Sequence, residues 1–208
     1  MKKRTKALLL VLCAIMLVTA SIMGTVAYLT STTETVSNTF SVGQVNITLS
    51  ETKVDVYGAQ LIGDAAGTTS QGQAYKMLPG HEYVKDPTIT VTAGSEPCWL
   101  FVKVENNIAG AESTAEGYKN IATQISENGW TALTGVDNVY YKEVAANTTD
   151  ADIDYPVFAS FAISDSLDGT ALAAFNEKTI VVNAYAVQKD GFDTAIAAWN
   201  ATFGASQE

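Results

Sequence analysis

The stretch IVVNAYAV, residues 180–187, predicts the fold class of this chain. Its side chains alternate between two sets, with Ile180 and Val182 in one set and Asn183 and Tyr185 in the other. When a pattern repeats every second residue, alternate residues lie on opposite faces of a β-strand. The β-branched and aromatic residues in the stretch also favour strands. We therefore expect a half-buried strand here.

The same alternation recurs upstream. Leu100, Val102 and Val104 alternate with Phe101, Lys103 and Glu105, and Ile89 and Val91 alternate with threonines. Val45, Ile47 and Leu49 form a further apolar set, and shorter candidate strands cover residues 130–133, 139–144 and 157–163. Residues 130–144 predict a hairpin whose turn is residues 135–138. We expect the following side chains to point inward from central strands or to be largely buried: Leu100, Val102, Val104, Ile180, Val182, Trp130 and Trp199.

Short strands separated by Gly, Pro, Asn and Asp predict an all-β domain, a single β-sandwich of the jelly-roll or immunoglobulin-like type. One or two short helices accompany it. Phe192, Ile196, Trp199 and Phe203 fall on one helical face, for which Asp193 is the candidate N-cap. A second short helix is expected within residues 167–175, and residues 58–74 are expected to form a long exposed loop.

The N-terminus has the layout of a secretory signal peptide. Four basic residues (Lys2, Lys3, Arg4 and Lys6) precede an apolar run over residues 7–23, and small residues follow. We expect a signal helix in residues 1–27 and cleavage between Ala27 and Tyr28. Residues 28–39 would then form a flexible N-terminal segment and residues 40–208 the β-sandwich domain. The alternative is an uncleaved membrane anchor, although the apolar run is slightly shorter than a spanning helix requires.

The charge of the chain argues against one class of function, and its cysteine content indicates the role of Cys98. Removal of the four basic leader residues leaves eight basic and 22 acidic residues, so the formal charge changes from −10 to −14. Such a surface repels phosphate backbones, which argues against nucleic-acid binding. Because Cys13 lies in the leader, Cys98 is alone in the mature chain and is expected to be a buried, inert thiol.

No motif predicts an enzyme. His81 follows the turn dipeptide Pro79-Gly80, is the single histidine of the chain, and is interpreted as a solvated turn residue. No HExxH zinc motif and no Gly-x-Ser-x-Gly elbow occurs. Asp150, Asp152 and Asp154 alternate as calcium ligands can, but the glycine and closing glutamate of an EF-hand are missing, which favours a solvated acidic loop. We therefore predict no catalytic residue, no cofactor and no metal site.

Several short motifs resemble the TasA/camelysin family of exported Gram-positive proteins, and in part a related clostridial group. At the N-terminal end these are GTVA at residues 24–27, NTFSVG at residues 38–43 and LSE at residues 49–51. Further on they are LPG at residues 78–80, KDP at residues 85–87 and AYAVQKDGF at residues 184–192, running to Ala198 and Trp199. The resemblance implies a jelly-roll-like β-sandwich, a leader cut by a signal peptidase of the SipW type, and a place outside the cell or on its surface.

The resemblance also implies a role. The chain would be a biofilm-matrix fibre subunit or fibre accessory, with itself or other matrix proteins as partners. The freed N-terminal segment of one subunit would add as a strand to the next, with Leu29 and Val36 as candidate donor-strand anchors. The membrane would be a partner only through the uncleaved leader. Two alternatives stay open: a camelysin-like surface metallopeptidase, and a surface binding module that does not polymerise.

Overall fold

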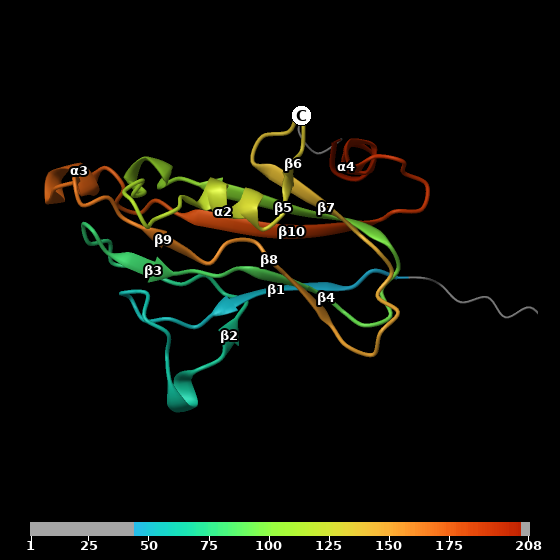
Figure 1. Ribbon diagram of the computed structural model, residues 1–208, viewed down its shortest axis with the longest axis horizontal. Helices are drawn as coiled ribbons and strands as arrows, with labels where there is room; N and C mark the ends of the chain where they lie inside the picture. The colour runs from blue at the N-terminus through green and yellow to red at the C-terminus, as the bar shows by residue number, and fades with distance from the viewer. Residues whose placement is uncertain (1–43, 205–208) are drawn as a thin grey trace, which may run out of the picture. The chain divides into compact units, whose positions relative to one another are not determined.

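The computed structural model describes residues 44–204, which form mostly antiparallel β-strands with short helices (Figure 1). The expected all-β class is confirmed. The expected signal helix, the cleavage site at Ala27 and Tyr28, and the anchors Leu29 and Val36 lie outside the described residues. The strands are β1 (Ile47–Thr52), β2 (Thr68–Thr69), β3 (Glu82–Val84), β4 (Thr88–Val91), β5 (Cys98–Asn106), β6 (Thr131–Ala132), β7 (Val139–Val144), β8 (Ile153–Pro156), β9 (Ser160–Ala162) and β10 (Ile180–Gln188).

Three α-helices and two 3-10 turns connect the strands of the described part. The helices are α2 (Ile121–Glu127), α3 (Gly169–Ala173) and α4 (Ala195–Phe203), and the 3-10 turns are η1 (Gly63–Ala65) and η2 (Ala109–Ala111). The number of helices is therefore one more than the sequence predicted. None of the helices within residues 44–204 has both the length and the apolar character needed to cross a membrane.

The strands form two four-stranded antiparallel sheets and one two-stranded ribbon. One sheet has the order β2-β1-β4-β8, the other has the order β10-β5-β7-β6, and β3 pairs with β9. In Figure 1 the sheet with β5 and β10 forms the upper layer, and β1 and β4 lie below it. The longest pairing joins β5 to β10, from Cys98 opposite Gln188 to Asn106 opposite Ile180.

The main core lies between the two sheets. Ile89 and Val91 of β4 contribute to it from one sheet, and Leu100 and Val102 of β5 from the other. Trp130 is also buried in this core. The alternation seen in the sequence thus marks the faces that the two sheets turn toward each other.

A second apolar cluster covers the outer face of the sheet that contains β5. Trp99 and Phe101 of β5 pack there against Trp199 of α4, and the rings of Phe101 and Trp199 have centroids 5.2 Å apart. Figure 1 shows α4 on the side of β5 and β10 away from β1 and β4. Because both faces of β5 are covered, its first five residues are all buried. The aromatic stripe on α4 therefore has a packing role.

The predicted strands are confirmed with one correction of position. Ile180 and Val182 do pack on the main core, but β10 lies at the edge of its sheet and both side chains are only half-buried. They were expected in a central strand. β6 and β7 form the predicted hairpin, in which Asn138 adopts a positive φ of 60°. The candidate strand at residues 157–163 is shorter than expected and contains β9.

The helix caps differ from expectation at one position. Thr194, not Asp193, is the N-cap of α4, because the Thr194 side chain accepts a hydrogen bond from the Ala197 N–H at 3.3 Å. α3 lies within the predicted residues 167–175 and is capped by Asp168. The sequence did not predict α2, whose N-cap is Asn120.

Candidate functional site

The free edge of β10 is the first feature that can bind a partner. The Asn107 N–H bonds to the Thr179 carbonyl at 3.1 Å, and the Lys189 N–H bonds to the Pro97 carbonyl at 2.8 Å. Antiparallel pairing alternates along a strand, so odd-numbered residues of β10 bond to β5. The backbone groups of Ile180, Val182 and Ala184 therefore point to the free edge, where no hydrogen bond from residues 44–204 satisfies them.

The other terminal strands of the two sheets are short or protected. β2 and β6 each have two residues. β8 carries Asp154 and Pro156, and a charge and a proline both hinder the addition of another strand. β10 has nine residues without a charged residue or a proline. Within the described part of the chain, β10 is thus the long sheet edge that lacks the usual protection against strand addition.

A cleft of about 1010 Å³ adjoins this edge, between β10 and β1. A free edge of β1 also faces this cleft. The Thr92 N–H bonds to the Asn46 carbonyl, so the even-numbered residues of β1 form the hydrogen bonds to β4. The backbone N–H and C=O groups of Ile47 and Leu49 therefore point away from β4. The cleft has apolar walls between two incompletely paired edges. The apolar lining includes Leu49, Phe161, Leu172, Phe175, Ile180 and Val182.

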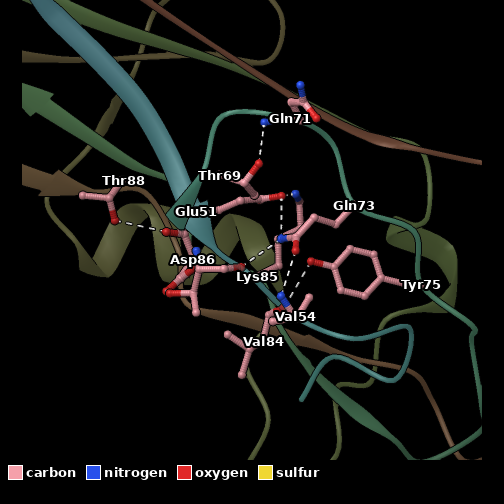
Figure 2. A network of polar contacts seen from close by, with 11 residues as sticks. Glu51, Val54, Thr69, Gln71, Gln73, Tyr75, Val84, Lys85, Asp86 and Thr88 are labelled. Atoms are coloured by element: carbon pink, nitrogen blue, oxygen red, sulfur yellow. Dashed lines mark hydrogen bonds and ion pairs between the residues drawn. The ribbon is translucent and has the colours of Figure 1, made fainter. Parts of the chain in front are cut away.

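A buried polar network forms the wall of the cleft next to β1 (Figure 2). Lys85 Nζ donates to Glu51 Oε2 at 2.6 Å, and both side chains are more than nine-tenths buried. Gln73 Nε2 donates to Glu51 Oε1 at 3.1 Å and to the Thr52 carbonyl at 2.9 Å. Gln73 Oε1 accepts from the Val54 N–H at 2.8 Å. Every polar atom of the Gln73 amide group is therefore engaged.

Tyr75 and Asp86 complete the network. The Tyr75 hydroxyl donates to the Val84 carbonyl at 3.2 Å, and the Lys85 ammonium lies 6.0 Å from the Tyr75 ring centroid. Burial, followed by the negative charges of Glu51 and Asp86, raises the pKa of Tyr75 well above its ordinary value, so this phenol stays neutral. Asp86 accepts hydrogen bonds from both the Thr52 N–H and the Thr52 hydroxyl. The network fixes the segment between β2 and β3 against β1.

The structure separates the candidate residues that the sequence singled out. His81 follows the predicted turn, is half-buried, and its Nε2 lies 2.8 Å from the Tyr57 carbonyl oxygen. Asp150, Asp152 and Asp154 are exposed. The Asp152 carboxylate accepts from the Ala93 N–H and that of Asp154 from the Thr90 hydroxyl. Residues 44–204 contain no group of three or more His, Cys, Asp and Glu side chains placed to hold a metal ion.

Cys98 is fully buried in the main core, as expected. Burial raises the pKa of its thiol from 9.0 to about 11. Glu51, Gln73 and Lys85 were not predicted as site residues, because partners up to 34 residues apart show no local periodicity. One signal was available: by the alternation of β1, Glu51 lies on the same face as the apolar Ile47 and Leu49, and Ser50 lies on the other face.

Comparisons of the chain with protein-family models, with curated proteins and with solved structures give no match.

Proposed function

We propose that this chain is an exported structural protein of the cell surface or extracellular matrix, a TasA-like fibre subunit or fibre accessory. The N-terminal segment freed by a SipW-type signal peptidase would add as a strand to the next subunit. The single observation that carries the proposal is the long unprotected edge of β10 beside a cleft with apolar walls. Unpaired edges of this kind accept an extended segment through backbone hydrogen bonds.

The proposal assigns a jelly-roll-like sandwich to the two facing sheets. It also assigns the cleft between β1 and β10 to the donor strand. Contact between the N-terminus of one copy and the cleft of another is head-to-tail, so it does not close on itself and generates a filament. The acidic surface would keep subunits soluble until the donor segment is available.

The donor segment is residues 28–39. In a regular strand Leu29 and Val36 lie on opposite faces, because their numbers have opposite parity. One of the two therefore faces the cleft and the other faces outward. Substituting each with Asp separately identifies the inward residue, since a charge facing the apolar wall blocks docking and a charge facing solvent does not.

A truncation tests the function. Protein that begins at Tyr28 should form fibres visible by electron microscopy, and protein that begins at Phe40 should remain monomeric. Mixing the truncated protein with a peptide of residues 28–39 should cap its cleft and raise its melting temperature. If protein without residues 28–39 forms fibres equally well, strand donation is contradicted. If protein that begins at Tyr28 stays monomeric at all salt concentrations, the chain is not a fibre subunit.

An edge substitution tests the acceptor site. In Ala184→Pro the lost N–H points to the free edge, so the β5 pairing stays intact while strand addition is blocked. Asn183→Pro is the matched control, because the N–H of Asn183 bonds to β5 and its loss should lower the melting temperature. If protein that begins at Tyr28 and carries Ala184→Pro polymerises as readily as the same protein without the substitution, β10 is not the acceptor edge.

A further inference from the structure

Glu51, Gln73 and Lys85 bring together the groups that amide exchange requires. A lysine amine is a nucleophile once it loses its proton, and a glutamine side chain has an electrophilic carbonyl carbon. One carboxylate, that of Glu51, contacts both groups: Oε2 lies 2.6 Å from Lys85 Nζ, and Oε1 lies 3.1 Å from Gln73 Nε2. Figure 2 shows the three side chains converging from β1, from the segment before β3 and from the residue after β3.

We propose that Lys85 and Gln73 become joined by an intramolecular isopeptide bond, with Glu51 as the catalytic acid and base. The bond would link Lys85 Nζ to Gln73 Cδ and release one molecule of ammonia. It would form in the folded chain without any cofactor or second protein. This inference does not depend on the proposed fibre function.

Glu51 Oε2 takes a proton from the Lys85 ammonium, which leaves a neutral amine and a neutral carboxylic acid. The Nζ lone pair attacks Gln73 Cδ, and the electron pair of the C=O bond moves onto Oε1. Glu51 gives its proton to Nε2 and then takes the surplus proton from Nζ, and the Cδ–Nε2 bond breaks as the C=O bond re-forms. The departing ammonia takes this second proton from Glu51 and leaves as ammonium, and Glu51 is again a carboxylate.

The surroundings favour each part of this step. The Lys85 and Glu51 side chains are only 8% and 9% exposed, so the reacting groups are largely shielded from bulk water, which would otherwise compete with the amine for the carbonyl carbon. The Val54 N–H donates to Gln73 Oε1 at 2.8 Å, where negative charge develops in the tetrahedral intermediate. The leaving nitrogen, Nε2, already contacts the group that must protonate it.

The fold also holds the reactants in place. Thr52 accepts from Gln73 Nε2 through its carbonyl oxygen, and Tyr75 is tied to the Val84 carbonyl next to Lys85. Reactants fixed in this way react as though at high effective concentration. For the attack, the Lys85 side chain must rotate so that Nζ moves from the Glu51 carboxylate to Gln73 Cδ. The resulting bond would tie the segment between β2 and β3 covalently to the residue that follows β3.

The test is mass spectrometry of the full chain after folding. Trypsin should not cut after Lys85, and residues 54–76 should remain joined to residues 77–103 through Gln73 and Lys85. The joined peptide should be lighter than the sum of its two parts by one ammonia molecule. A folded chain that trypsin cuts after Lys85, with Gln73 unmodified after prolonged incubation, would overturn the proposal.

Variants separate the chemistry from a structural role. Lys85→Arg keeps the positive charge against Glu51 but lacks the nucleophilic amine, so the joined peptide should disappear while the domain still folds. Glu51→Gln should slow formation of the bond after refolding by roughly 10²–10⁴-fold, the usual contribution of acid–base catalysis. Gln71→Ala is the matched control on the same segment and should leave the bond intact. Formation at the wild-type rate in Glu51→Gln would show that Glu51 is not the catalyst.

Discussion

Gly58 packs its backbone directly against Tyr83. A Cβ on Gly58 would lie 2.7 Å from the Tyr83 Cα, and Gly58 has a positive φ of 77°. The Gly58 carbonyl accepts from the Val84 N–H at 3.2 Å, so the turn at residues 55–59 is fixed against β3. Neither the contact nor the backbone angle tolerates a larger residue.

Gly58→Ala should lower the free energy of unfolding by about 2–5 kcal/mol, because the left-handed conformation and the overpacking both add a penalty. Gly63→Ala is the matched control: Gly63 also has a positive φ, of 64°, but no atom beyond its two chain neighbours lies within 4 Å of an added Cβ. Gly63→Ala should lower the free energy of unfolding by only about 1–2 kcal/mol. Urea titration of both variants measures the difference, and equal losses would mean that the Tyr83 contact is unimportant.

Val102→Asp should lower the free energy of unfolding by more than about 4 kcal/mol, or prevent folding, because it places an unpaired charge in the main core. Val102 is fully buried on β5. Val181→Asp, on the neighbouring strand, replaces a side chain that is 37% exposed and should stay within about 0.5 kcal/mol of the wild type. Circular dichroism during thermal unfolding compares them, and a mild effect at Val102 would contradict the assigned core.

Thr194→Ala should cost about 1 kcal/mol of stability, since it removes the oxygen that accepts the Ala197 N–H at the start of α4. Asp193→Ala, one residue earlier, should change stability by less than about 0.5 kcal/mol. Chemical denaturation of the two variants distinguishes the caps. If Asp193→Ala lowers stability more than Thr194→Ala does, Asp193 is the N-cap, as the sequence predicted.

Cys98 should make the protein less stable as the pH rises from 9 to 11. Its pKa in the folded chain is about 11 and its unperturbed value is 9.0, so the folded state holds the proton more tightly. The resulting stabilisation is complete below pH 9 and is lost as the pH approaches 11, a change of about 2–3 kcal/mol. The stability difference between wild type and Cys98→Ala, measured at pH 8 and pH 11, should change by this amount; a constant difference would contradict it.

Local pattern was enough to predict most strands, because alternation is visible within a few residues. It identified β4, β5, the β6–β7 hairpin and β10. It placed β10 in the middle of a sheet, although β10 lies at the edge. The partner of a strand is set by residues far away, here β5 some 80 residues earlier in the chain, so Ile180 and Val182 carry no local mark of their position.

Short helices and buried polar groups were harder to predict. α2 has seven residues, and Ile121 and Ile125 lie one turn apart, a spacing that occurs often by chance. Glu51, Gln73 and Lys85 look like surface residues in the sequence, since charged residues are rarely buried without a partner. Their burial depends on a segment that folds back on β1, which no local property of these residues indicates.

The two apolar clusters on opposite faces of β5 divide the three tryptophans. Trp130 lies in the cluster between the sheets, whereas Trp99 and Trp199 lie in the cluster beneath α4. Variants that keep only Trp130 or only Trp199 therefore give separate fluorescence signals for the two faces of one sheet. The order in which the two signals change during refolding would reveal whether α4 docks before or after the two sheets close on each other.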